Sequence, residues 1–474
     1  MIDLKNLTIT KARKQLDDKD FSARELAEAY LKKIEELNPE INVYLEVYDD
    51  VLKQADIADQ MISSGQSSDL TGIPLALKDN ILVSGKRATS ASKILEGFIS
   101  PYDSTAVSKI KSQGAVLLGR CNMDEFAMGS STENSAFGVT KNPHDLSRVA
   151  GGSSGGSAAS VASDMALGAL GSDTGGSVRQ PASLCGVVGL KPTYGAVSRH
   201  GLMAMGSSLD IIGTIAKSVS DAEMIFRTIS GKDIMDSTTI EIPKNKISKN
   251  KNLTIGVPYH FIEQEGIDQS VRENFKSSLK KLETLGYNLK EIELPYAEYS
   301  LAAYYVIMPA EVSSNLARFD GVKYGLHSDG KNIIEDYFKT RAMGFGPEVR
   351  RRIILGTYVL SSGYYDSYYG KALTVRQKIS DDFNRVFKDV DVIATPTTPS
   401  PAFKIGEKVS DPLSMYLADI FTVTANIIGI PAISLPSGFV NIDSKNLPIG
   451  FQLMAPHKSE SVLFELGKNF LGEV

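Results

Sequence analysis

The sequence predicts an α/β fold in which helices cover most of a central sheet. Segments with strand character alternate with segments of helical periodicity along the chain, which is typical of α/β layering. The composition, 42% hydrophobic and 23% charged, is ordinary for a protein that buries a large core. Length alone, 474 residues, would allow two or three domains, although large α/β folds often exceed that rule.

The first part of the chain predicts helices and then strands. Residues 1–60 read as helices, and Asp20 or Ser22 is placed to cap ARELAEAYLKKIEELN, whose apolar residues recur every three or four positions. The strand-like segment GIPLALKD follows. A helix around 104–114 and the strand-like segment AVLLGR come next.

The later segments repeat this alternation around one unusual region, 142–194. That region contains two Gly/Ser clusters and a helix of small residues, SAASVASDMALGA. A polar stretch at 230–252 predicts an exposed connection. LTIGVP, a helix over 269–285 and NLKEIELP form a strand-helix-strand unit, and 297–386 reads as mostly helical. The chain ends on the strand-like segments VDVIATPTT, AISLPSG and IGFQLMAP.

Charge and cysteine content exclude several classes of protein. The net charge of −5 argues against a large nucleic-acid surface, because such surfaces are usually basic. Cys121 and Cys185 lie in no Cys/His cluster, so neither a disulfide framework nor a metal site is expected. The N-terminus lacks signal-peptide character, and no long apolar stretch predicts a membrane span. We therefore expect a soluble, cytoplasmic protein.

The first Gly/Ser cluster, GGSSGGS at 151–157, has three possible roles. Taken alone it would serve equally well as a flexible linker. The helix of small residues that follows at once favours instead a loop that enters a packed helix. A phosphate loop is disfavoured, because GxxxxGK(S/T) needs a lysine that is absent at that spacing. The glycines suit a site at which backbone approaches another group closely.

The second cluster, Gly171 to Arg179, predicts acyl-transfer chemistry. Three consecutive backbone N–H groups, those of Thr174, Gly175 and Gly176, can converge on one point if side chains stay away. Such a nest suits the oxyanion of a tetrahedral intermediate. A serine directly after it, Ser177, is placed to attack the carbonyl held there.

A serine nucleophile needs a base, and the best candidate is Lys78. None of the five histidines lies in a triad context, and the chain has no GxSxG elbow. Lys78 follows the apolar run GIPLAL, where burial would lower its pKa. Considered alone, this segment would first be interpreted as a solvated lysine at the end of a strand.

Taken together, LALKDN, GGSSGGS and GSDTGGSVRQPA resemble the amidase signature family over nearly the whole chain. The stretches 121–138, RVAGGSSGGSAASVA at 148–162, and 311–325 narrow the resemblance to A subunits of glutamyl-tRNA(Gln) and aspartyl-tRNA(Asn) amidotransferases. The resemblance implies an amidase-signature fold, with a large mixed twisted sheet covered by helices on both faces. It also implies one catalytic domain over 1–474, divided into N-terminal helices to 60, a catalytic core at about 70–230, the polar connection, and a substrate-pocket and helical part from 253.

The resemblance also implies roles for individual residues. Lys78 would be the general base, Ser153 a bridging serine held by a cis peptide, and Ser177 the nucleophile. By the same matching of positions, the pocket for the α-carboxylate and α-amino groups of glutamine would be formed by Tyr304, Arg352 and Asp419.

The implied function is hydrolysis of glutamine to glutamate and ammonia. B and C subunits would be the partners, and one of them would use the ammonia, ATP and Mg²⁺ to convert misacylated Glu-tRNA(Gln). This chain itself would need no cofactor, would meet tRNA only through the partner, and would not contact a membrane. Two alternatives remain: a free-standing amidase that acts on another carboxamide, and a non-catalytic scaffold subunit, which the complete set of catalytic residues disfavours.

Overall fold

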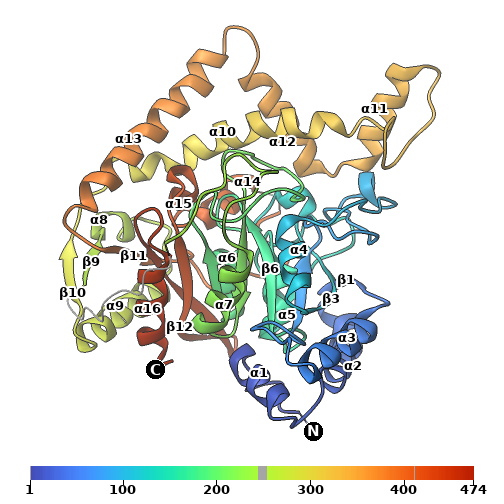
Figure 1. Ribbon diagram of the computed structural model, residues 1–474. Coiled ribbons are helices and arrows are strands. Elements are labelled where there is room, and N and C mark those ends of the chain that lie inside the picture. Colours follow the sequence, from blue (N-terminus) through green and yellow to red (C-terminus); the bar gives the residue numbers. More distant parts are fainter. Residues whose placement is uncertain (1, 244–252, 410, 474) are drawn as a thin grey trace.

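The computed structural model describes residues 2–243, 253–409 and 411–473, and its centre is a mixed sheet. Within those ranges the sheet has 11 strands, and Figure 1 shows helices around it. In spatial order the strands are β1 (Tyr44–Val47), β3 (Val116–Cys121), β2 (Pro74–Lys78), β6 (Gly168–Asp173), β8 (Ile211–Ala216), β7 (Val188–Lys191), β12 (Ala432–Ile442), β13 (Lys445–Met454), β11 (Val392–Pro396), β9 (Thr254–Val257) and β10 (Asn288–Glu291). A separate pair is formed by β4 (Lys141–Asn142) and β5 (Asp145–Val149).

The helices divide into a group that packs around the sheet and a group that forms a layer across one end of it (top of Figure 1). The first group is α1 (Ile9–Asp17), α2 (Ala23–Ile41), α3 (Val51–Ser63), α4 (Thr105–Ser112), α5 (Gly155–Ala162), α6 (Arg179–Cys185), α7 (Val219–Ile229), α8 (Tyr259–Ile262), α9 (Gln269–Thr284) and α16 (Glu460–Leu471). The end layer includes α10 (Ser300–Asn315), α11 (Ile333–Gly344), α12 (Pro347–Val359) and α13 (Lys371–Val386), with α14 (Pro412–Tyr416) and α15 (Val423–Ile428) beneath them. One-turn helices include η2 (Glu125–Ala127) and η6 (Leu417–Asp419), and η5 (Asp366–Gly370) is a π-helix.

Strand pairing brings the predicted catalytic segments together. β2 runs parallel to both β3 and β6, its neighbours in the sheet, and β6 is antiparallel to β8. The carboxyl ends of parallel strands meet at one edge of a sheet, so Lys78, the last residue of β2, lies beside the end of β6 and the turn that leads to Ser177. β12 pairs with β7, so the C-terminal part of the chain continues the same sheet.

The apolar core has two principal parts. The larger lies between the sheet and helices such as α2, α7, α9 and α16. The smaller lies under α10, α12, α13 and α15, where it supports the helical layer at the end of the sheet. Helices therefore cover the sheet as the sequence predicts. Among the described residues, no helix is both long and apolar enough to cross a membrane.

Several expectations for individual elements need correction. The first sixty residues include a strand, β1, because YLEV pairs antiparallel with β3. The predicted helix of small residues stops at Ala162, near Asp164 with its positive φ of 59°, and the residues after the resulting turn enter β6. Ser22, not Asp20, caps α2, where its side chain and that of Glu25 form a capping box. Part of the predicted polar connection, 244–252, lies outside the described residues.

Candidate active site

Lys78 is fully buried and faces serine oxygens. Its Nζ lies 2.7 Å from Ser153 Oγ, 2.9 Å from Ser172 Oγ and 3.2 Å from the Ser172 carbonyl oxygen. Burial lowers the pKa of Lys78 to about 7, although Asp124, Asp173 and Asp210 act in the opposite direction. A solvated lysine is thereby excluded, because the side chain is 0% exposed. Near neutral pH this amine can accept a proton.

Ser153 is placed by a buried loop at the start of α5. The Gly152–Ser153 peptide bond is cis, and the Ser153 carbonyl oxygen accepts a hydrogen bond from the Asp124 backbone N–H at 3.2 Å. A Cβ on Gly152 would lie 2.1 Å from Asp124 Oδ2, so only glycine fits there. The segment 151–157 is buried throughout, which excludes the flexible linker considered from sequence.

Ser177 stands at the turn between β6 and α6, beside the Ser153 loop. The Ser177 carbonyl oxygen accepts a hydrogen bond from the Ser154 backbone N–H at 3.1 Å, which ties the two loops together. The hydrogen bonds in the described part of the chain include none between the Ser153 and Ser177 hydroxyls. Catalytic hydrogen bonds are often long without substrate, so transfer between these two serines stays a prediction.

The predicted oxyanion nest is only partly available. The Gly176 N–H donates to Asp173 Oδ1 at 2.8 Å, so it supports the turn and does not face a substrate. The N–H groups of Thr174 and Gly175 have no hydrogen-bond partner among the described residues. These two donors remain to hold an oxyanion, and the prediction of three is corrected to two.

The glycines of the nest allow side chains from distant elements to approach. A Cβ on Gly175 would lie 2.8 Å from Cζ of Tyr304, and one on Gly176 would lie 2.1 Å from Thr422 Oγ1. Gly176 also has a φ of +138°, which side chains strongly disfavour. Glycine is therefore needed at both positions, and the close approach places α10 directly against the nest.

A buried ion pair holds the nest in place. Arg179 donates to both carboxylate oxygens of Asp173 at 3.0 Å, and also to the Thr422 carbonyl oxygen, Gln452 and Asn426. Burial would raise the pKa of Asp173, but the Arg179 guanidinium overrides that effect and lowers the pKa to about 2. The carboxylate therefore stays ionised and can keep accepting the Gly176 N–H.

The three residues predicted to hold a substrate come from different elements of the end layer. Arg352 on α12 is buried, its Nε donates to Glu348 Oε1 at 2.7 Å, and its guanidinium carbon lies 5.5 Å from the ring centre of Tyr305. Asp419 on η6 accepts a hydrogen bond from Ser130 Oγ at 2.7 Å, and burial raises its pKa to about 7. Tyr304 on α10 is buried against Gly175.

These three predicted pocket residues influence one another electrostatically. The charge of Arg352 acts to lower the pKa of both Asp419 and Tyr304, whereas burial raises both. A cation, a carboxyl group and a phenol are thus gathered near the oxyanion nest. This combination can recognise a small molecule that carries both a carboxylate and an ammonium group.

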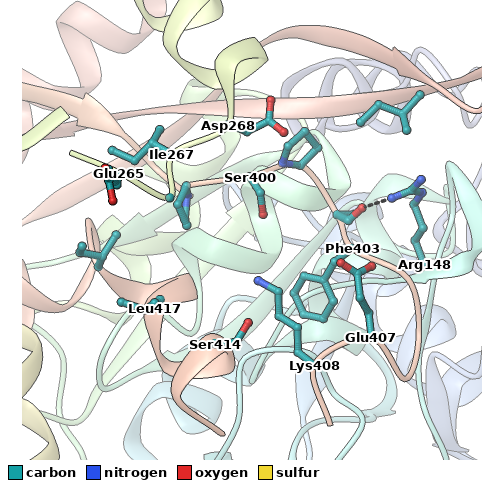
Figure 2. Close-up of a pocket in the computed structure, with 16 residues that line it drawn as sticks. Arg148, Glu265, Ile267, Asp268, Ser400, Phe403, Glu407, Lys408, Ser414 and Leu417 are labelled. Carbon is teal, nitrogen blue, oxygen red and sulfur yellow. Dashed lines mark hydrogen bonds between the residues drawn. The ribbon is translucent and has the colours of Figure 1, made fainter. Parts of the chain in front are cut away.

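Open cavities lie beside the site and not at its centre. A cavity of about 60 Å³ reaches Arg352, with Lys408 and Tyr416 in its wall. A larger cavity, about 410 Å³, is shown in Figure 2, where Arg148 donates to the Ala402 carbonyl oxygen at 2.6 Å. None of the predicted site residues lines that larger cavity. The predicted catalytic residues lie instead in the buried cluster around Lys78.

Sequence reasoning left several supporting residues unassigned. Ser172 and Asn80 contact the Lys78 network, Asp173 holds the nest, and Glu348 orients Arg352. One of these had a local signal, since Glu348 precedes Arg352 by four positions on a helix. Ser172 and Asp173 lie inside the quoted motif, but nothing in the motif indicates which way their side chains point.

Known proteins resemble this chain over nearly its full length. The family model described as Amidase matches residues 25–464. The A subunit of the glutamyl-tRNA(Gln) amidotransferase from Desulfosudis oleivorans is 53% identical over 470 residues, which cover 98% of this chain and 96% of the relative. Its counterpart from Desulfatibacillum aliphaticivorans is 50% identical over 473 residues, which cover 98% of this chain and 97% of that relative.

Solved structures show the same likeness. The A subunit of the glutamyl-tRNA(Gln) amidotransferase from Thermotoga maritima has a TM-score of 0.81 and 44% identity, with 99% of this chain and 95% of that chain covered. The native peptide amidase from Stenotrophomonas maltophilia has a TM-score of 0.83 but 26% identity, with 99% and 97% covered. The fold alone therefore does not separate the two activities, whereas sequence identity does. On the family match and these relatives, the chain belongs to the amidase family.

Proposed function

We propose that this enzyme is the glutaminase subunit of a tRNA-dependent amidotransferase. The observation that carries the proposal is the identity of 50–53%, over nearly the full length, to relatives named as A subunits of glutamyl-tRNA(Gln) amidotransferases. Amidases of other activity share the fold at about half that identity. The buried, charged pocket supports the same proposal, because an apolar pocket would suit fatty or aryl amides.

Glutamine is held at its α-carbon by charged groups. Arg352 pairs with the α-carboxylate, Asp419 with the α-ammonium, and Tyr304 borders the amide end beside the nest. The Asp419 carboxyl group is about half ionised near pH 7, and an arriving ammonium favours its ionised form. Glu348 fixes the guanidinium orientation before glutamine arrives, which reduces the entropy lost on binding.

Catalysis is a proton relay that ends on Lys78. Neutral Lys78 takes the hydroxyl proton of Ser153, which takes that of Ser177 as Ser177 Oγ bonds to the side-chain carbonyl carbon of glutamine. The carbonyl oxygen becomes an oxyanion facing the N–H groups of Thr174 and Gly175. As the C–N bond breaks, the proton returns through the same relay to the leaving nitrogen, and ammonia departs. Water then attacks the resulting ester by the same steps and releases glutamate.

The ammonia is passed to partner subunits, the B and C subunits of the amidotransferase. The partner that receives it uses ATP and Mg²⁺ to activate misacylated Glu-tRNA(Gln), and tRNA meets this chain only through that partner. No cofactor is needed on this chain for amide hydrolysis, because the relay supplies both the base and the acid.

The test separates ammonia production from its use. Arg352→Ala should raise the KM for glutamine about ten- to a hundredfold, because a charge-assisted contact worth about 1.5–3 kcal/mol is lost. Arg350→Ala, an exposed position on the same helix, is the matched control and should leave KM nearly unchanged. In the complex assembled with its partners, ammonium chloride should restore tRNA amidation to the Arg352 variant. Failure of ammonium to restore it would contradict a role limited to ammonia supply.

A further inference from the structure

We propose that Ser172 and Asn80 act together as a positioning pair that keeps the lone pair of Lys78 directed at Ser153. Both are 2% exposed, and neither is placed to touch the substrate. The inference rests on the proton relay of the proposed function but not on glutamine as the substrate. It concerns how a lysine with several serine neighbours takes a proton from the correct one.

Lys78 has three acceptors around Nζ, and they match the three hydrogens of an ammonium group. They are Ser153 Oγ at 2.7 Å, Ser172 Oγ at 2.9 Å and the Ser172 carbonyl oxygen at 3.2 Å. A neutral amine has two hydrogens and one lone pair. One hydrogen must point to the carbonyl oxygen, which can only accept. The lone pair therefore faces one of two hydroxyls, and only Ser153 leads to the nucleophile.

The choice depends on where the Ser172 hydroxyl proton goes. If that proton points at Lys78, it occupies the lone pair and the relay is blocked. If it points elsewhere, Ser172 Oγ must accept a hydrogen from Lys78, and the lone pair is left for Ser153. Asn80 is the side chain on the far side of Ser172 Oγ, at 2.9 Å.

Asn80 can take that proton when its carboxamide presents oxygen to Ser172. With Nδ2 facing Ser172, Asn80 Oδ1 is buried without a hydrogen-bond partner in the described part of the chain. A buried oxygen of that kind is costly. A half-turn of the amide, which has nearly the same shape either way, lets Oδ1 accept the Ser172 hydroxyl proton. Oδ1 then has a partner, Nδ2 takes the buried position that Oδ1 occupied, and the lone pair of Lys78 is left for Ser153.

The pair also stabilises the protonated lysine. Three carboxyl groups, those of Asp124, Asp173 and Asp210, favour the charge on Lys78 from neighbouring segments, and burial opposes it. Ser172 adds two direct acceptors, and hydrogen bonds to an ion are roughly twice as strong as neutral ones. Loss of the Ser172 hydroxyl should therefore lower the pKa of Lys78 further.

The variants give different expected changes in the pH profile of kcat. Ser172→Ala should lower the high-pH plateau about ten- to a hundredfold and shift the midpoint to lower pH, with KM unchanged. Ser172→Thr keeps the hydroxyl, so its plateau and its midpoint should be close to those of wild type. Asn80→Ala should lower the plateau. Asn80→Asp still accepts the proton but adds a negative charge, so it should keep most of the plateau and move the midpoint to higher pH.

A matched control separates positioning from stability. Ser157 is a buried serine on α5. Its Oγ donates to the carbonyl oxygen of Leu170, on the same strand as Ser172, at 3.0 Å, and it is not among the hydrogen-bond partners of Lys78 in the described part of the chain. Ser157→Ala should leave the plateau and the midpoint of kcat unchanged. A loss of activity in this control as large as in Ser172→Ala would overturn the proposal, because the effect would then be structural.

An independent readout does not need turnover. The ¹³C chemical shift of the lysine ε-carbon, titrated in the intact chain, reports the pKa of Lys78 directly. Ser172→Ala should lower that pKa and Asn80→Asp should raise it. The proposal would be overturned if Lys78 had the same pKa in both variants as in wild type and Ser172→Ala also kept the wild-type kcat plateau. Failure of the wild type to hydrolyse glutamine would count against the proposed function alone.

Discussion

The pKa of Lys78 leads to the most demanding prediction. With an ordinary pKa near 10.5, on the order of three lysines in ten thousand would be neutral at pH 7. Burial lowers the pKa of Lys78 to about 7, so roughly half are neutral at that pH. The site therefore increases the amount of neutral base by a factor on the order of a thousand. Replacing Lys78 with arginine should abolish turnover, because guanidinium keeps its proton throughout the working range.

The direction of the pH dependence of kcat follows from the protonation state in which Lys78 is active. Only the neutral amine accepts a proton. Wild-type kcat should therefore rise about tenfold for each pH unit below about 7 and level off above about 8. The assay is ammonia release at saturating glutamine, because Asp419 titrates in the same range and acts through KM. A wild-type kcat that stayed flat from about pH 5 to 8, or substantial kcat in Lys78→Arg, would refute the reasoning.

Two further predictions concern binding and stability. Asp419→Asn should raise the KM for glutamine. It should also remove the fall in KM that we expect for wild type as pH rises through about 7, where this carboxyl group ionises. An unchanged KM profile would remove Asp419 from the pocket. Arg179→Met should lower the free energy of unfolding by about 3–5 kcal/mol, measured by urea denaturation, because Asp173 would be left as an unpaired buried charge. The exposed pair of Arg24 with Asp56 supplies the control, and Arg24→Met should barely change the transition. Equal destabilisation in both variants would contradict the role given to burial.

The strands were predictable where an apolar run is bounded by Gly, Pro or polar residues. β2, β3, β9 and β11 to β13 follow that rule. β1 was not predictable, because its four residues alternate weakly and gain stability by pairing with β3. Short apolar runs such as β7 and β8 carry no periodicity that separates a strand from a buried helix.

The arrangement of the candidate site could be predicted where the residues are neighbours in sequence and not where their contacts depend on the fold. The nest and Ser177 lie in one segment, and the run before Lys78 indicates its burial. The hydrogen bond from the Gly176 N–H to the Asp173 carboxylate could not be predicted, because it depends on how the Asp173 side chain folds back onto its own loop. The contact of Asn80 with Ser172 joins residues 92 positions apart, which no local pattern reveals.

The covalent intermediate tests the central claim most directly. The wild-type protein, mixed with glutamine and quenched in acid, is digested and analysed by mass spectrometry. We expect a γ-glutamyl group on the peptide that contains Ser177, with the ester on Ser177 itself and none on Ser153. Ser177→Ala should show no adduct and no ammonia release. An adduct on another residue, or ammonia release by Ser177→Ala at the wild-type rate, would contradict the account.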